Sequence, residues 1–277
     1  MNRGRAHVAV RGLALLALVA AGLVMTAASP SAGANAALQS TQAARPHHPA
    51  PSHFTKGRVT NPWFPLHPGD RYVYRGIDGK ARTRDVMIAT YRTRVVDGVV
   101  CRVVFDRVWS NGVLSERTRD FYAQTKGGTV WYFGERTATL DRHGHVTSRE
   151  GSFTSGVNGA EAGVFMKAHP RLGPSYYQEY YPGHALDVFT VRQRDAHMVV
   201  PLMNTHHALL TKETTALEPG VVDHKYYVRD IGSVRELTVK GGSESLWLVG
   251  LTHLLRHQSS SLAGRSSRWS TLDRPTR

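Results

Sequence analysis

The chain has 277 residues, a formal net charge of +14 at pH 7 and one cysteine, Cys101. A single cysteine excludes an internal disulfide framework, so a stable exported domain must depend on a full hydrophobic core. The positive charges are scattered singly along the chain, which argues against a nucleic-acid partner and is compatible with peripheral attraction to an anionic envelope surface.

The first 36 residues have the layout of a secretory signal peptide. Arg3, Arg5 and Arg11 form a positive region, an apolar run follows over residues 13–28, and small residues lead to residues 34–36. The apolar run is shorter than the roughly 20 residues of a membrane span, although an uncleaved N-terminal anchor is an alternative. We therefore expect a protein that is secreted or associated with the cell envelope.

Two segments of biased composition flank the expected folded domain, which covers residues 59–255. Residues 37–58 are rich in Ala, Pro, Ser and Thr and show no apolar periodicity, which predicts a disordered linker. Residues 256–277 are rich in Ser and Arg and almost lack apolar residues. They predict a disordered basic tail.

The body of the chain is divided by hairpin signals. Asp97–Gly98 and Asn111–Gly112 stand between alternating runs, and both dipeptides favour the positive φ angles of tight hairpins. Gly127–Gly128 and His143–Gly144 divide the next runs, and further glycines punctuate the rest. We predict a single all-β domain of about twelve mostly antiparallel strands, a meander that forms a barrel-like or strongly curved sheet or a sandwich.

A glycine-rich stretch, residues 154–174, interrupts this meander. A long connection inside a compact domain is typical of a lid or a binding loop. A strap that crosses over and closes one end of the sheet is the alternative. A short helical turn is expected within residues 159–168.

Four stretches, taken as a set, resemble a family of exported all-β proteins of actinobacteria whose activity is not described. They are NPWFPLHPGDRYVYRG (61–76), FYAQTKGGTVWYFGE (121–135), the stretch 151–187 that ends in YYQEYYPGHALD, and LEPGVVDHKYYVRDIGSVREL (217–237). The resemblance covers nearly the whole body. It implies export and a β-fold, and it transfers no activity, cofactor or catalytic residue to this chain.

Side chains two positions apart in a strand share one face, so faces can be sorted from the sequence. Carboxylates then fall on aromatic-rich faces, and Trp131, Phe133 and Glu135 are expected to share one. Such faces either line a cavity that orients a ligand or fill a core in which the acids form structural pairs. The predicted ligand-binding residues are Asp120, Tyr122, Trp131, Phe133, Glu135, Tyr177, Glu179, Tyr181, His184 and Tyr226.

Catalytic chemistry has weaker support in the sequence. No zinc-protease, serine-esterase or P-loop signature occurs. Glu135, Glu179, Glu213 and His224 are weak catalytic candidates, because two carboxylates at a suitable spacing can hydrolyse a glycoside. We expect no metal ion and no cofactor.

Three functions fit these observations. The first is a monomeric exported domain that binds an envelope lipid, a glycan or another partly apolar ligand on an aromatic and acidic face. The second is a hydrolase of envelope glycans or esters that uses a carboxylate and histidine cluster. The third is a wall-associated protein-interaction module, which an exposed apolar patch would favour.

Overall fold

The structure of the protein is a computed structural model that describes residues 43–256 and 258. The expected signal peptide and nearly all of the expected basic tail lie outside the described residues. Strands make up most of this part of the chain, together with one turn of 3-10 helix, η1 (Pro51–His53). No helix found there is long and apolar enough to cross a membrane. The predicted all-β class is confirmed.

The described residues form seventeen strands. The first nine are β1 (Thr60–Asn61), β2 (Phe64–Pro65), β3 (Asp70–Asp78), β4 (Ala81–Val96), β5 (Val99–Ser110), β6 (Val113–Gln124), β7 (Val130–Leu140), β8 (Val146–Ser148) and β9 (Phe153–Thr154). The other eight are β10 (Glu161–Met166), β11 (Ser175–Tyr177), β12 (Glu179–Tyr180), β13 (Asp187–Val200), β14 (Met203–Thr215), β15 (Val222–Val228), β16 (Gly232–Lys240) and β17 (Ser245–His253). Eleven of them have six residues or more, which agrees with the expected number.

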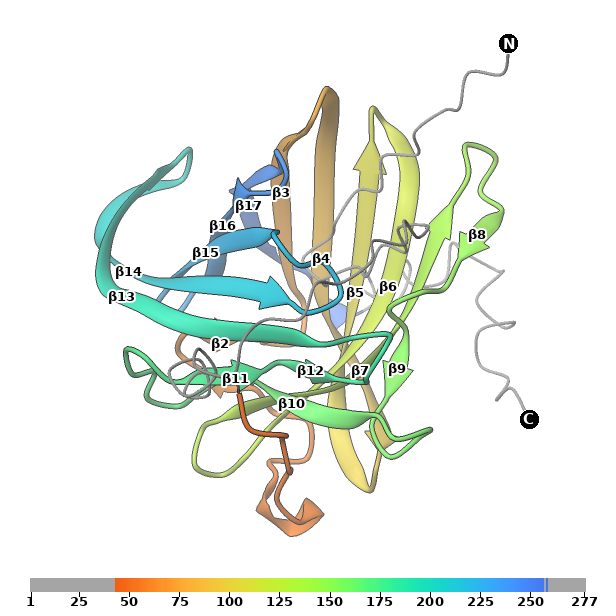
Figure 1. Ribbon diagram of the computed structural model, residues 1–277, viewed down its shortest axis with the longest axis vertical. Helices are drawn as coiled ribbons and strands as arrows, with labels where there is room; N and C mark the ends of the chain where they lie inside the picture. Colours follow the sequence, from red (N-terminus) through yellow and green to blue (C-terminus); the bar gives the residue numbers. More distant parts are fainter. Residues whose placement is uncertain (1–42, 257, 259–277) are drawn as a thin grey trace, which may run out of the picture.

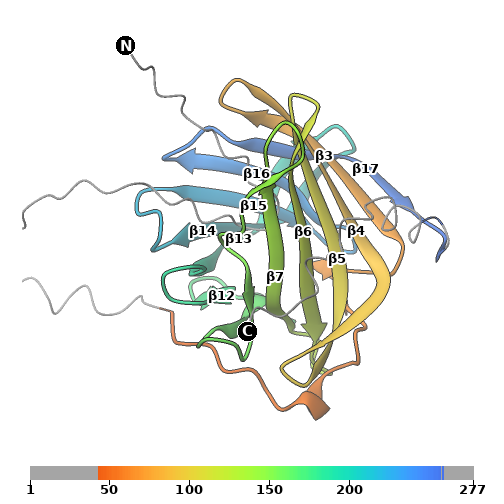
Figure 2. The same ribbon diagram turned by 90° about the vertical axis from the view of Figure 1, so that its right-hand side faces the viewer.

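Fifteen of these strands form one antiparallel sheet that curls into a nearly closed barrel (Figure 1). The path through the sheet is β11-β13-β14-β15-β16-β17-β3-β4-β5-β6-β7-β10-β12, and β8 and β9 pair with β7 beside this path. Strands β3 to β7 lie side by side nearest the viewer in Figure 2. Consecutive strands are neighbours almost everywhere, as expected for a meander.

One short piece of chain, residues 175–180, supplies both ends of the sheet and is termed the closing segment. Its first half, β11, pairs with β13, and its second half, β12, pairs with β10. Gln178 lies between the halves and holds both sides. Its backbone N–H donates to the carbonyl oxygen of Asp187 at 2.7 Å, and its Nε2 donates to that of Phe165 at 3.3 Å. The tyrosine-rich stretch is therefore the seam of the barrel.

The glycine-rich stretch contributes β10 to the barrel wall, where the sequence alone favours a short helical turn. β10 pairs with β7 on one side and with β12 on the other. Its side chains on both faces are buried, including Ala162, Val164 and Met166. Two strand partners and burial on both faces outweigh the local helical preference, so this part of the stretch is extended.

The hairpin turns lie where the dipeptides predict them. Asp97 and Gly98 have φ angles of 47° and 73°, and Asn111 and Gly112 have φ angles of 49° and 83°. Both residues of each turn are left-handed, which is the type I′ geometry that matches the twist of the flanking strands. These turns fix the register of β4, β5 and β6.

A β-bulge in β7 changes which side chains face the barrel interior. Between the pairs Asp120–Glu135 and Tyr122–Tyr132, β6 advances two residues and β7 advances three. The extra residue is accommodated at Gly134, whose φ angle is 132°. Glu135 and Tyr132 consequently point into the barrel, while Phe133 points outward.

Gly134→Ala should be strongly destabilising. A Cβ at this position would meet the carbonyl oxygen of Phe153 on β9, and the φ angle is one that alanine rarely adopts. Strain and overpacking together predict a loss of roughly 2–6 kcal/mol in the free energy of unfolding. Gly112→Ala is the matched control, because its φ is also positive but no atom lies within 4 Å of the new Cβ. Urea denaturation of both variants separates the effect of the close approach from that of the φ strain. Equal losses in the free energy of unfolding would contradict a contribution from the contact with Phe153.

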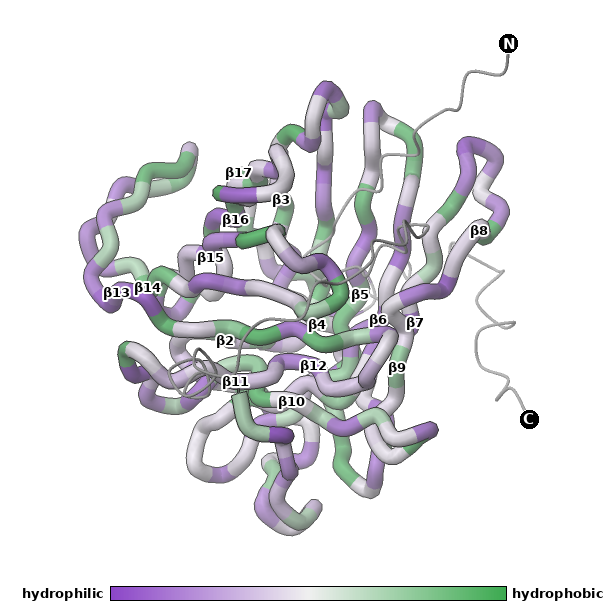
Figure 3. Tube along the Cα trace, viewed as in Figure 1, coloured by the Kyte–Doolittle hydropathy of each residue, from purple (hydrophilic) through white to green (hydrophobic). Residues whose placement is uncertain are grey.

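The sheet has an apolar cluster on each side, consistent with the alternation of hydropathy along its strands (Figure 3). The inner cluster fills the barrel and includes Tyr72, Tyr122 and Phe189. The outer cluster lies on β5 to β7 and includes Phe121 and Phe133.

Residues 43–58, termed the strap, cover the outer cluster, which differs from the disordered linker expected over 37–58. Phe54 is 4% exposed, and its ring centroid lies 5.4 Å from that of Phe133. The backbone N–H of Thr55 donates to the carbonyl oxygen of Gln124 at 2.9 Å. An aromatic side chain and backbone hydrogen bonds therefore hold this proline-rich stretch against the sheet.

Candidate functional site

The barrel interior holds a large group of buried acids. Within the described residues, eleven carboxylic side chains are buried: Asp85, Asp106, Glu116, Asp120, Glu135, Glu179, Asp187, Glu213, Asp223, Glu236 and Glu244. The alternation of side chains along each strand turns them inward among tyrosines and aliphatic residues. Buried carboxyls require protons, cations or hydrogen-bond donors, because an isolated buried charge is very costly.

Tyr132 links two of these acids. Its hydroxyl lies 2.7 Å from Asp120 Oδ1 and 2.8 Å from Glu135 Oε2. The hydroxyl has one proton and can donate to only one carboxylate, so the other carboxyl must itself carry a proton and donate to the tyrosine oxygen. Burial, followed by the neighbouring acid, raises the pKa of both carboxyls well above the usual range. The group is therefore a hydrogen-bonded pair that retains a proton at neutral pH.

Other interior acids show the same behaviour. Burial raises the pKa of Asp85 to about 7 and that of Asp187 to about 6. The pKa values of Asp106 and Glu179 are raised well above their usual range, again mainly by burial and then by the charge of a neighbouring aspartate. Glu179 on β12 faces Asp187 on β13, so this pair spans the seam of the barrel.

Lys225 on β15 is the lysine buried among these acids. Its Nζ lies 2.9 Å from Glu213 Oε2 and 3.6 Å from Glu236 Oε2, and its side chain is 2% exposed. Its burial would lower the pKa, but the two glutamates outweigh burial and leave the pKa of Lys225 raised. A single lysine thus forms ion pairs with two carboxylates in the barrel interior.

The interior leaves little free space beside these groups. The cavity lined by Asp106, Asp120, Tyr122, Lys225 and Tyr227 measures about 10 Å³. That volume is about the minimum for one water molecule. A lipid or a sugar does not fit in this cavity.

The structure separates the residues that the sequence predicts to form one site. Asp120, Tyr122, Glu135, Glu179 and Glu213 are buried in the barrel interior. Trp131 and Phe133 belong to the outer cluster, and the bulge at Gly134 is the reason that they do not share a face with Glu135.

The histidines and the remaining tyrosines lie elsewhere. Tyr177 and Tyr181 are half-buried at the seam, and the exposed His184 bonds to Glu150 at 3.1 Å. His224 and Tyr226 alternate with the buried residues of β15, and Tyr226 is partly buried and packs against the edge of the apolar cluster. Burial, and then Arg192, lower the pKa of His224. The structure therefore does not place His224 on the same side of the sheet as Glu135, Glu179 and Glu213.

The outer side of β3 to β7 carries arginines, and this surface is termed the arginine face. Its members are Arg71 and Arg75 on β3, Arg82 and Arg84 on β4, Arg107 on β5, Arg117 and Arg119 on β6, and Arg136 on β7. Three pairs of them are directly opposite each other across strands: Arg75 and Arg84, Arg107 and Arg117, and Arg119 and Arg136. Like charges in such positions are destabilising, so the arrangement has a cost for the fold.

A hollow of about 360 Å³ opens at one end of this face, lined by Arg75, Arg82, Thr83, Arg84, Trp109 and Gly112. It is termed the arginine hollow. The guanidinium carbon of Arg84 lies 4.8 Å from the ring centroid of Trp109, which orients this side chain. All three arginines are exposed, and none forms an ion pair with an acid in the described part of the chain.

The arginine face is not evident from the sequence, because its arginines do not stand next to one another in the chain. The signal that could have found it is the spacing of two in Arg82–Thr83–Arg84 and Arg117–Thr118–Arg119. Within a strand, this spacing places both arginines on one face. Pairing of the strands then brings the separate charges together.

Comparison with known proteins gives distant structural neighbours. No protein-family model and no curated protein matches the sequence. A candidate exported protein with a YmcC-like fold from Bacteroides fragilis is 11% identical, with a TM-score of 0.39 over 69% of this chain and 98% of its own. A candidate lipoprotein from Parabacteroides distasonis is 8% identical, with a TM-score of 0.37 over 70% of this chain and 100% of its own.

Proposed function

We propose that the protein is an exported β-barrel domain that binds an anionic polymer of the cell envelope on its arginine face. The observation that carries the proposal is the arginine hollow, where three exposed arginines meet beside Trp109 without an acidic partner among the described residues. Guanidinium groups bind phosphate and carboxylate in a two-pronged geometry, so this surface suits a chain of such groups.

The distribution of acids strengthens the basic character of the outside. Eleven carboxylic side chains of the described residues are buried, whereas the eight arginines of the arginine face point outward. The field felt by a partner is therefore more positive than the net charge suggests, which increases the rate of encounter with a polyanion. A polymer fits better than a membrane, because Arg75 on β3 and Arg82 and Arg84 on β4 line one hollow and can neutralise neighbouring charges of a repeating chain.

Binding to poly(glycerol phosphate) tests the proposal, with neutral dextran as the control ligand. The triple variant R75Q/R82Q/R84Q is expected to bind at least about tenfold more weakly, since three charge-assisted contacts are lost. The affinity of the unaltered protein should fall steeply between 50 and 300 mM salt.

A second variant separates the arginine face from the basic tail. R265Q/R268Q/R274Q removes the same number of charges from the C-terminal segment and is expected to retain most of the affinity. If this variant loses the binding and the triple variant of the hollow retains it, the proposal is wrong. Binding to anionic vesicles without binding to the polymer would identify a membrane surface, and not a polymer, as the partner.

A further inference from the structure

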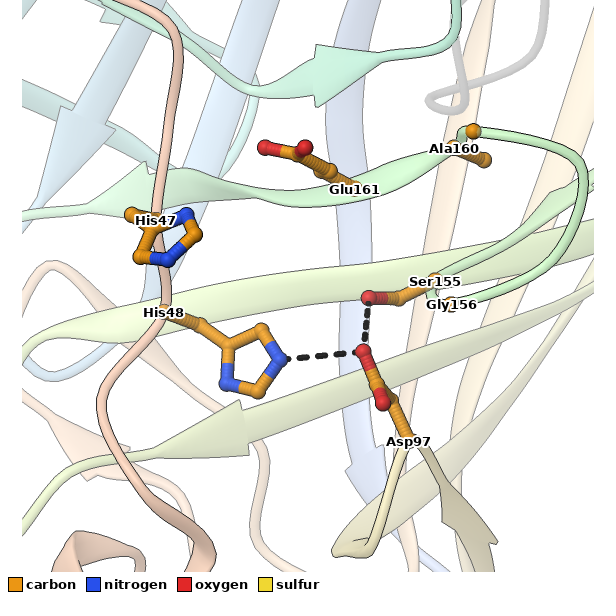
Figure 4. A pocket seen from close by; sticks show the side chains of 8 residues that line it. His47, His48, Asp97, Ser155, Gly156, Ala160 and Glu161 are labelled. Atoms are coloured by element: carbon orange, nitrogen blue, oxygen red, sulfur yellow. Dashed lines mark hydrogen bonds and ion pairs between the residues drawn. The ribbon is translucent and has the colours of Figure 1, made fainter.

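A second hollow lies away from the arginine face, where the strap passes the turn at Asp97 and the loop before β10. It has a volume of about 390 Å³ and is lined by His47, His48, Asp97, Ser155, Gly156, Gly159, Ala160 and Glu161 (Figure 4). It is termed the strap groove. Its volume is within the range of about 300–1,000 Å³ that is typical of pockets for small ligands.

One wall of the strap groove is a hydrogen-bonded group centred on Asp97. Its Oδ2 accepts from His48 Nε2 at 3.0 Å and from Ser155 Oγ at 2.9 Å (Figure 4). Partial burial would raise the pKa of Asp97, but these two hydrogen bonds outweigh burial and leave the pKa lowered. The acid stands between serine and histidine, whereas a hydrolytic triad has histidine in the middle. This wall is therefore suited to binding and not to nucleophilic attack.

The other wall is formed by Glu161 on β10. Arg45 of the strap bonds to Oε1 of Glu161, with its Nε at 2.8 Å. Oε2 of the same carboxylate is buried and has no hydrogen-bond partner among the described residues. A buried acceptor without a donor is costly, so a ligand hydroxyl group that reaches Oε2 after a small rotation of the carboxylate would improve this site.

Two aromatic rings lie beside the groove, next to the ion pair of Arg45 and Glu161. The guanidinium carbon of Arg45 lies 5.5 Å from the ring centroid of Tyr180, and Tyr177 packs edge-on against Tyr180 at 5.1 Å. Both tyrosines are half-buried parts of the closing segment. Tyrosine offers an apolar ring together with a polar hydroxyl, which suits a ligand with both apolar and polar faces.

The charges of the groove balance one another. Arg45 neutralises Glu161, and His48 bonds to Asp97. A charged ligand would therefore meet no unpaired opposite charge among these four groups, and nothing favours the anions that the arginine face attracts.

We infer that the strap groove binds a neutral sugar residue. A sugar offers several hydroxyl groups that can donate to the Asp97 and Glu161 carboxylates, and Tyr180 supports this site by contacting Arg45, the partner of Glu161. The histidines of the strap and the tyrosines of the closing segment, which are far apart in the sequence, then serve one site. This site stands independently of the anion site on the arginine face.

Saturation-transfer NMR on the secreted chain tests this inference with maltose, cellobiose and N,N′-diacetylchitobiose as probes. At least one probe is expected to bind, and Tyr180→Ala and Glu161→Gln should each weaken that binding at least fivefold. Tyr226→Ala and Asp195→Asn are the matched controls, because these residues neither line the groove nor contact Arg45, the partner of Glu161. Both controls should bind like the unaltered protein.

The test also separates this site from the proposed anion site. Sugar binding should persist in 0.5 M NaCl and in R75Q/R82Q/R84Q, conditions under which polymer binding is lost. Binding of none of the three probes would overturn the inference, and so would binding that Tyr180→Ala and Glu161→Gln leave unchanged. Binding that is lost with salt would assign the sugar contact to the arginine face.

Discussion

Lys225→Met is expected to lower the free energy of unfolding by about 3–5 kcal/mol at pH 7. The Nζ of Lys225 is the cation 2.9 Å from Glu213 and 3.6 Å from Glu236 inside the barrel. Methionine has a similar volume and leaves no cavity, so the loss comes from carboxylates that are buried without a counter-charge. Urea denaturation followed by tryptophan fluorescence measures the change.

Two further variants identify the cause of this loss. Lys212 lies on the neighbouring strand β14, outside the group of buried acids. Lys212→Met should therefore change the free energy of unfolding by less than about 1 kcal/mol. Combining Lys225→Met with Glu213→Gln should recover part of the loss, because the amide removes one unpaired charge. A Lys225→Met protein as stable as the unaltered one would show that both glutamates are neutral and need no cation.

Stability is expected to fall as pH rises from 5 to 8. Asp85 has a pKa of about 7 in the folded protein and 3.8 as the ordinary value, and burial is the main cause. The folded state therefore binds more protons than the unfolded state in this window, so stability is full below about pH 4 for this group and is lost as pH rises through 7. This single shift corresponds to a free energy on the order of 4 kcal/mol. Asp187, with a pKa of about 6, adds a loss between about pH 4 and 6.

Asp85→Asn should remove much of this pH dependence. The amide is neutral at every pH, so the variant is expected to be more stable than the unaltered protein at pH 8 and similar to it at pH 5. Asp195→Asn is the control, because its side chain is 77% exposed. Thermal denaturation at half-unit steps of pH gives the profile. A melting temperature that rises from pH 5 to 8 would contradict the burial of protonated carboxyls.

Much of the fold follows from local chemistry. The Asp-Gly and Asn-Gly turns determine the hairpins around Gly98 and Gly112, and alternation determines the strands. The seam does not follow in this way, because residues 175–180 read as one strand and act as two half-strands with different partners. The extended conformation of β10 also depends on its neighbours in the sheet. Neither β7 nor β12 is adjacent to β10 in the sequence, so local patterns do not predict these pairings.

The candidate site was less predictable than the fold, for a physical reason. Alternation sorts side chains into two faces, but a single extra residue exchanges the faces beyond it. The bulge at Gly134 separates Phe133 and Trp131 from Glu135 in this way. The strap groove depends on Arg45 and His48 meeting Glu161 and Asp97, and such long-range contacts have no periodic signal in the sequence.

The inward acids and outward arginines are two results of the same alternation. On β4, Asp85 is buried while Arg84 is exposed, and on β5, Asp106 is buried while Arg107 is half-buried. Both arrangements have a cost for folding, from buried carboxyls on one side and from opposed like charges on the other. Costs of this kind are typically retained where function requires them. The outward arginines are the groups to which the proposed polymer would bind.

The most direct test of that assignment is an NMR titration of the arginine Nε–Hε signals with poly(glycerol phosphate). We expect the signals of Arg75, Arg82 and Arg84 to shift and saturate, while those of Arg192 and Arg194, exposed on β13, stay in place. Equal shifts for both groups, or no shift at the arginine hollow, would contradict the central claim that this face is the binding surface.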